Sequence, residues 1–119
     1  MRFITPTVHG YLDYLIAVAL IAGPFVLFPA GTDPIVFWLP VIAGAGLIGY
    51  SLLTDMAASA RKLIPFKLHL LLDLSAVLGF LALPFILGMS GTPKLFYLAF
   101  GAAGLLFVVL TNPNKTANS

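Results

Sequence analysis

Residues 6–28 read PTVHGYLDYLIAVALIAGPFVLF, an apolar stretch interrupted by one histidine and one acidic residue, His9 and Asp13. A helix needs about 20 residues to cross the hydrocarbon core of a bilayer, and this stretch is long enough to do so. The sequence therefore predicts a transmembrane helix here.

Three further stretches have the same character, and the residues between them favour turns or are polar. The breaks at residues 29–34 and 88–93 contain glycine and proline, which are typical of turns. The break at residues 55–67 is polar and basic. We expect an all-α membrane protein with four spans: Pro6–Phe28, Pro34–Thr54, Pro65–Leu87 and Pro93–Leu110.

Composition supports this class and excludes others. The chain is 61% hydrophobic and 8% charged, whereas a soluble domain is about 25% charged. The net charge of +2 is too small and scattered to indicate a nucleic-acid partner. The chain has no cysteine, which excludes disulfides and thiolate chemistry. The predicted partner is the lipid bilayer.

The sequence also matches itself at a spacing of 60 positions without a gap. His9 aligns with His69, Asp13 with Asp73, and Pro24 with a second proline. The matches continue through Gly31-Thr32 with Gly91-Thr92 and Ala43-Gly44 with Ala103-Gly104. This pattern predicts two copies of a two-span unit, residues 1–60 and 61–119, the second ending in a short polar tail that begins at Thr111 and is expected to be frayed.

Because each unit holds two spans, both units enter the membrane in the same direction. We expect a parallel repeat, with the halves related by rotation about the membrane normal. Basic residues gather on the side of both termini, and one lies on the other side. The positive-inside rule then predicts a cell-membrane protein with both termini in the cytoplasm. These basic residues are Arg2, Arg61, Lys62, Lys67 and Lys115 on one side, and Lys94 on the other.

Ionisable residues within the spans are the candidate site. His9 and Asp13, like His69 and Asp73, are four residues apart, a spacing that places both side chains on one helix face. A charged side chain at the centre of a membrane helix costs about 2.5–3.5 kcal/mol on insertion scales. We therefore expect both carboxylates to face the bundle interior, within hydrogen-bonding reach of a His, Tyr or backbone partner. The histidine of the same helix is the nearest candidate, and a neighbouring helix is the alternative.

Several functions are compatible with these pairs. The first hypothesis is a non-enzymatic protein in which a His/Asp polar centre serves packing, ion contact or partner binding. The second is a redox protein with haem or a divalent metal on His9 and His69, since bis-His ligation suits helix bundles. The third is a small multimeric transporter. Catalysis is disfavoured because no nucleophile, base and orienting group occur at a recognisable spacing. The simplest expectation is that the chain has no cofactor, with haem or a divalent metal as the alternatives.

Other residues have structural interpretations. Pro24 and Pro84 lie late in the first and third spans, where proline kinks a helix. Two pairs of small residues four positions apart permit close helix contact, either within the chain, with a second copy or in a larger complex. Four aromatic residues are expected to anchor the helices at the membrane interfaces. The small pairs are Ala45/Gly49 and Ala99/Ala103, and the aromatic residues are Tyr11, Tyr14, Trp38 and Tyr97.

Two tandem two-span units, each with an early Asp and a late Pro-aromatic pair, resemble the SPW-repeat membrane proteins of bacteria. The residues concerned are Asp13 with Pro24-Phe25 and Asp73 with Pro84-Phe85. This chain has Gly-Pro-Phe and Leu-Pro-Phe where the family name denotes Ser-Pro-Trp. The resemblance covers nearly the whole chain and implies a four-span protein of the bacterial inner membrane. It implies no particular activity or cofactor.

Overall fold

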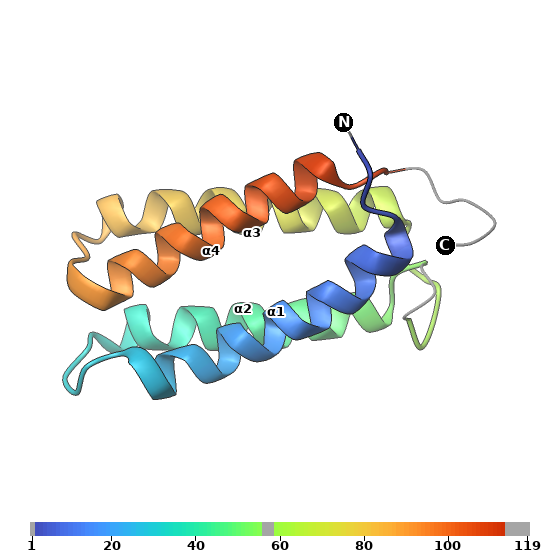
Figure 1. The fold of residues 1–119 in the computed structure, drawn as a ribbon. Helices are drawn as coiled ribbons and strands as arrows, with labels where there is room; N and C mark the ends of the chain where they lie inside the picture. Colours follow the sequence, from blue (N-terminus) through green and yellow to red (C-terminus); the bar gives the residue numbers. More distant parts are fainter. Residues whose placement is uncertain (1, 56–58, 114–119) are drawn as a thin grey trace.

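The computed structural model describes residues 2–55 and 59–113, which form four helices (Figure 1). All four are long and apolar enough to cross a membrane. The predicted all-α fold with four spans is therefore confirmed, and the helices indicate a multi-pass membrane protein. They are α1 (Pro6–Leu27), α2 (Pro34–Leu52), α3 (Phe66–Ile86) and α4 (Gly91–Leu110).

The first two helices begin where side chains can satisfy free backbone N–H groups. The Thr5 hydroxyl accepts a hydrogen bond from the Val8 N–H at 3.2 Å, and the Asp33 carboxylate accepts one from the Ile35 N–H at 2.8 Å. A proline follows each of these caps, which suits the first helical turn because its missing N–H would have no partner there. Local sequence thus explains where α1 and α2 start.

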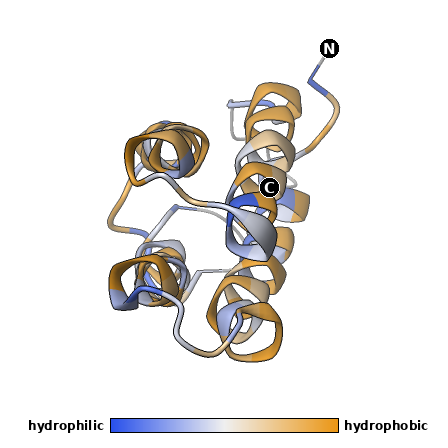
Figure 2. Ribbon diagram, turned by 90° about the vertical axis from the view of Figure 1, so that its left-hand side faces the viewer, coloured by the Kyte–Doolittle hydropathy of each residue, from blue (hydrophilic) through white to orange (hydrophobic). Residues whose placement is uncertain are grey.

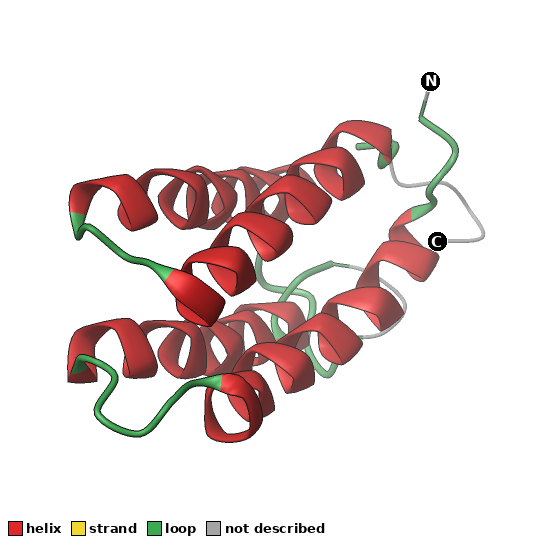
Figure 3. Cartoon of the chain, turned by 60° about the vertical axis from the view of Figure 1, so that its left-hand side comes forward, coloured by secondary structure: helices red, strands yellow, loops and turns green. Residues whose placement is uncertain are grey.

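The helices pack as two hairpins. Helix α1 packs closely along α2 and α3 along α4, whereas α1 with α4 and α2 with α3 share few contacts. The loops within the hairpins lie at one end of the molecule, and the α2–α3 connection lies at the other (Figure 3). The first and last described residues lie at this second end (Figure 1). The backbones of Ile4 and Asn112 are hydrogen-bonded there at 2.8 Å.

Glycine allows close helix contact within each hairpin. A Cβ atom added to Gly44 of α2 would lie 2.7 Å from the backbone oxygen of Ala17 in α1. A Cβ atom added to Gly101 of α4 would lie 2.7 Å from the Leu81 side chain in α3. The predicted small pairs are not the ones used for this contact, because all of their members face outward: Ala45, Gly49, Ala99 and Ala103.

The two hairpins make corresponding contacts, but at two spacings. Helices α1 and α3 start 60 positions apart, whereas α2 and α4 start 57 positions apart. Thr54 and Thr111, just beyond these second helices, are also 57 apart and both donate to the carbonyl four residues before them. In the 57-position register Gly44 corresponds to Gly101, although Gly104 also packs against Val77, the residue 60 positions after the Ala17 that Gly44 contacts. Helix α3 is one residue shorter than α1, and the connection that follows it is two residues shorter.

Tyr97 also differs from its prediction. It is fully buried instead of lying at an interface, and its hydroxyl donates to the backbone oxygen of Val36 in α2 at 2.8 Å. That oxygen lacks its usual helical donor because the residue four positions later is Pro40, which has no N–H. Tyr97 thus satisfies a carbonyl that proline leaves free. Trp38 and Tyr11 are exposed, as an anchoring role requires.

The prolines late in α1 and α3 are fully buried and lie inside continuous helices. Helix α1 runs past Pro24 to Leu27, and α3 runs past Pro84 to Ile86. Neither proline ends its helix at once, and a kink at each stays a prediction.

Apolar side chains cover much of the outer surface, as contact with lipid requires. Hydrophobic residues occupy most of each helix in the view along the bundle (Figure 2). Several large ones are more than 60% exposed, which would be costly in water. Examples are Leu15, Val26, Ile42, Ile86 and Leu95.

Candidate functional site

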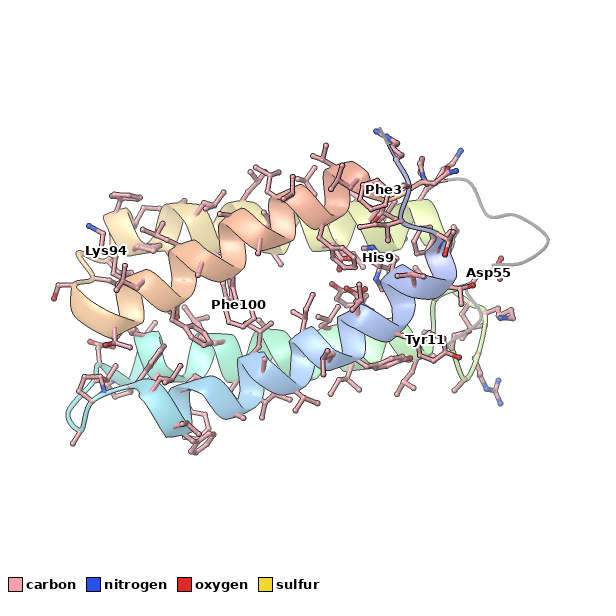
Figure 4. All side chains as sticks on the ribbon, viewed as in Figure 1. Phe3, His9, Tyr11, Asp55, Lys94 and Phe100 are labelled. Carbon is pink, nitrogen blue, oxygen red and sulfur yellow. The ribbon has the colours of Figure 1, made fainter. Side chains whose placement is uncertain are left out.

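The four ionisable residues singled out in the spans lie together between the hairpins. His9 and His69 are fully buried, Asp13 is 2% exposed and Asp73 is 7% exposed. They come from the first turns of α1 and α3, and Figure 4 shows His9 pointing into the space between the hairpins. Both carboxylates thus face the interior, as their desolvation cost requires. We call these four side chains the His/Asp ring.

The hydrogen bonds of the ring connect the two hairpins. His9 Nε2 lies 2.8 Å from Asp73 Oδ2, and His69 Nε2 lies 2.5 Å from Asp13 Oδ2. The contacts within one helix are longer, at 2.9 Å for His9 with Asp13 and 3.3 Å for His69 with Asp73. The expectation that each Asp has a histidine partner is confirmed, but the shortest contact is to the histidine of the other hairpin and not to the one on the same helix. Each Oδ2 faces both Nε2 atoms, which closes the ring.

One threonine contacts the far side of each imidazole. The hydroxyl of Thr111 lies 2.8 Å from His9 Nδ1 and donates to the Phe107 carbonyl. Because the single hydroxyl proton is used there, Thr111 must accept from His9, so Nδ1 carries a proton. The Thr54 hydroxyl likewise donates to the Tyr50 carbonyl and accepts from His69 Nδ1 at 2.7 Å. Both Nε2 atoms are thereby turned toward the carboxylates.

These bonds determine how the ring holds protons. With Nδ1 protonated, each short Nε2–Oδ2 contact requires one further proton, either on the imidazole or on the carboxyl group. Two protons shared among two imidazoles and two carboxylates leave the ring with no net charge in either arrangement. A neutral ring suits a site enclosed by apolar helices, where net charge is costly.

The ring is nearly symmetric, with one difference. Tyr50 donates its hydroxyl to Asp73 Oδ1, and its ring lies edge-on to the His69 imidazole. Phe107 occupies the corresponding place in the other hairpin and stacks on the His9 imidazole at 4.2 Å. Phenylalanine has no hydroxyl, so Asp73 receives a hydrogen bond that its counterpart Asp13 does not receive from this position. The two carboxylates are chemically distinct.

Sequence reasoning missed Tyr50 and both threonines. Thr111 was expected to begin a frayed tail, but it is fully buried and hydrogen-bonded to His9. Its position directly after an apolar span, repeated by Thr54, was the available signal. The rest of the predicted tail from residue 114, and Lys115, lie outside the described residues.

A cavity of about 250 Å³ lies beside the ring between the hairpins. Asp13, Tyr50 and Asp73 supply its polar side chains. The other lining residues are apolar and include Phe100, which Figure 4 shows between the hairpins. The cavity therefore brings a small space into contact with the carboxylates, but it does not provide a continuous polar path.

The ring suits a small ion better than haem. One ligand atom from each of its four residues lies within 4.8 Å of the others. Haem with two histidine ligands requires the porphyrin plane between the Nε2 atoms, where Asp13 and Asp73 make their contacts. Haem would have to displace both carboxylates. A divalent ion would use them as ligands.

Comparison with known proteins identifies no relative. No family model, curated protein or solved structure matches the chain. The resemblance to SPW-repeat proteins stays a prediction, and the geometry of the site is what bears on function.

Proposed function

We propose that the chain is a non-enzymatic, multi-pass protein of the bacterial cell membrane in which the His/Asp ring joins the two hairpins. The observation that carries the proposal is that the shortest ring contacts, His9 to Asp73 and His69 to Asp13, cross from one hairpin to the other. The threonine contacts cross as well. The backbones of the two hairpins approach each other at few places, and apolar side chains such as Leu20, Phe80 and Phe96 fill part of the space between them.

Hydrogen bonds between the hairpins occur toward both ends of the bundle, which supports a packing role. His9 lies toward the end with the termini (Figure 4), and the rest of the ring and the two threonines are linked to it by the contacts given above. Toward the other end, Tyr97 of α4 is bonded to α2. Between them the cavity separates the hairpins. Polar contacts are suited to joining membrane helices, because lipid tails compete well with apolar side chains but offer no hydrogen bonds.

The proposal includes an internal duplication, with both halves inserted in the same direction. The support is the recurrence of the ring contacts at a spacing of 60 and of the threonine contacts at 57. It also includes cytoplasmic termini, because Arg2, Arg61, Lys62 and Lys67 flank the spans at that end and Lys94 lies at the other. A second copy or a larger membrane complex remains a proposed partner.

Replacing the carboxylates in the full-length chain tests the packing role. Asp13→Leu removes the acceptor for His69 while keeping a side chain of similar size. We expect it to lower the free energy of unfolding by about 1–3 kcal/mol, the cost of leaving a buried polar group without a partner. Asp13→Asn, the matched control, should cost less because the amide can still hydrogen-bond to an imidazole. Titration of the purified protein with denaturing detergent measures both.

Two outcomes would contradict the packing role. One is an Asp13→Leu protein as stable as the wild type, and the other is equal destabilisation by Asn and Leu. Absorbance of protein purified from its native host tests the haem alternative, since a Soret band at one haem per chain would favour it over the packing role.

A further inference from the structure

We propose that the His/Asp ring binds one divalent transition-metal ion through His9 Nε2, His69 Nε2, Asp13 Oδ2 and Asp73 Oδ2. This inference goes beyond the packing role, since the ring could join the hairpins with protons alone.

The threonines prepare the imidazoles for metal binding. A histidine binds a metal through a nitrogen lone pair, and a hydrogen bond from its other nitrogen sets which nitrogen is free. Thr54 and Thr111 accept from Nδ1 of His69 and His9, so the lone pair belongs to Nε2 in each neutral imidazole. Metal-binding histidines are usually oriented by such an outer contact.

The distances are close to those of a four-coordinate site. Ligand bonds of about 2.0–2.1 Å to zinc place tetrahedral ligand atoms about 3.3 Å apart. The four neighbouring Nε2–Oδ2 distances in the ring are 2.5, 2.8, 2.9 and 3.3 Å. Side-chain shifts of less than about 1 Å would therefore admit the ion. All four atoms are donors that zinc and its neighbours accept.

Charge balance also favours a divalent ion. Without metal, two shared protons neutralise the two carboxylates. A metal ion of charge +2 takes the place of both protons, which leave for the solvent as the ion binds. The ring is neutral before and after, so the exchange adds no net charge to the site. A monovalent ion would leave one carboxylate needing a proton.

The donor set selects among divalent ions. Magnesium and calcium prefer a complete set of oxygen ligands, whereas imidazole suits zinc, iron and their neighbours in the first transition series. Two of the four ring donors are imidazole nitrogens. The cavity next to Asp13 and Asp73 supplies space by which an ion can approach the ring.

The test uses the full-length protein, purified in detergent, stripped with a chelator and titrated with Zn²⁺ or Co²⁺. We expect one ion per chain and release of two protons per ion, measured by calorimetry in buffers of different ionisation enthalpy. Co²⁺ should show the visible absorption of a four-coordinate site, and Zn²⁺ should raise the melting temperature. Mg²⁺ at the same concentration should not bind stoichiometrically and should not raise the melting temperature.

Variants test each part of the site. Asp13→Asn with Asp73→Asn removes both anionic ligands, should abolish stoichiometric binding and should keep the fold through amide–imidazole hydrogen bonds. Asp33→Asn, the same change at an exposed helix cap, should bind as the wild type does. Thr111→Val should weaken binding by about 10–100-fold, the usual effect of losing an outer contact. Its control is Thr92→Val, at an exposed threonine.

The outcomes separate this inference from the packing role. A folded wild type that binds no Zn²⁺ or Co²⁺, or a double Asp→Asn protein that binds as the wild type does, would overturn the metal site and leave the packing role standing. A stable Asp13→Leu protein would overturn the packing role without touching the result of the metal titration on the wild type. Binding without proton release would also overturn the proposed exchange.

Discussion

Tyr97→Phe should destabilise the bundle through one identifiable atom, the backbone oxygen of Val36. Tyr97 is fully buried, and its hydroxyl is 2.8 Å from that oxygen. Pro40 cannot supply the helical N–H that would otherwise satisfy it. An unsatisfied buried group costs about 1–3 kcal/mol, whereas hydrogen bonds between membrane helices average about 0.6 kcal/mol and reach about 1.7. We expect a loss of about 1–1.5 kcal/mol, toward the upper end of the membrane range.

A double-mutant cycle isolates this bond. Pro40→Ala restores an N–H four residues after Val36, which gives the carbonyl a donor from its own helix. Tyr97→Phe in the Pro40→Ala background should then cost about 0.5 kcal/mol or less, a coupling of about 0.5–1 kcal/mol between the two sites. Unfolding by denaturing detergent measures all four proteins. Tyr11→Phe, at a 62% exposed tyrosine, is the control and should change little.

Additive effects of Tyr97→Phe and Pro40→Ala would refute the reasoning. They would mean that the Val36 oxygen does not depend on Tyr97 for its hydrogen bond. An equal loss of stability from Tyr11→Phe would show that the effect of Tyr97→Phe does not depend on the Val36 hydrogen bond.

Three further predictions concern the hairpins and the ring. Tyr50→Phe should keep the fold and lower the free energy of unfolding by about 1 kcal/mol in the same assay, because Asp73 loses one hydrogen-bond donor. The other hairpin has Phe107 at the corresponding position and lacks this donor already. A loss above about 3 kcal/mol would mean that the hydroxyl is essential to the ring. Gly44→Ala should destabilise by about 1–3 kcal/mol, since its Cβ would lie 2.7 Å from a backbone oxygen of α1, whereas Gly49→Ala meets nothing within 4 Å and should not. Reporter fusions at both termini should report the cytoplasm, and opposite locations would rule out four spans.

The fold was predictable because the apolar stretches and the turn residues between them indicate the same four helices. Four apolar stretches of sufficient length, separated by turn residues, leave few alternatives to four membrane helices. The burial of Asp13 and Asp73 also followed from cost alone. Both conclusions depend on local composition, which a single sequence contains in full.

The partners within the site were not predictable in the same way. Four-residue spacing suggested that Asp13 pairs with His9, whereas the shortest contact joins it to His69 of the other hairpin. Which helices face each other depends on how the hairpins dock, and that information is absent from helical periodicity. Thr111 was missed for the same reason, since its partner is 102 residues away. Tyr97 was misassigned because aromatic residues near a span end are usually interface anchors.

The two sets of ring contacts have a consequence for biosynthesis. The ribosome delivers α1 and α2 before α3 exists, so His9 and Asp13 must enter the membrane without their final partners. At that stage the contact between His9 and Asp13, 2.9 Å in the finished protein, can already shield the carboxyl group because both residues belong to α1. When α3 is made, it adds His69 and Asp73, which also contact each other within one helix. Once the two hairpins dock, the shortest contacts are those that join His9 to Asp73 and His69 to Asp13. Each hairpin therefore contains a histidine that can shield its own acidic residue before the other hairpin is present.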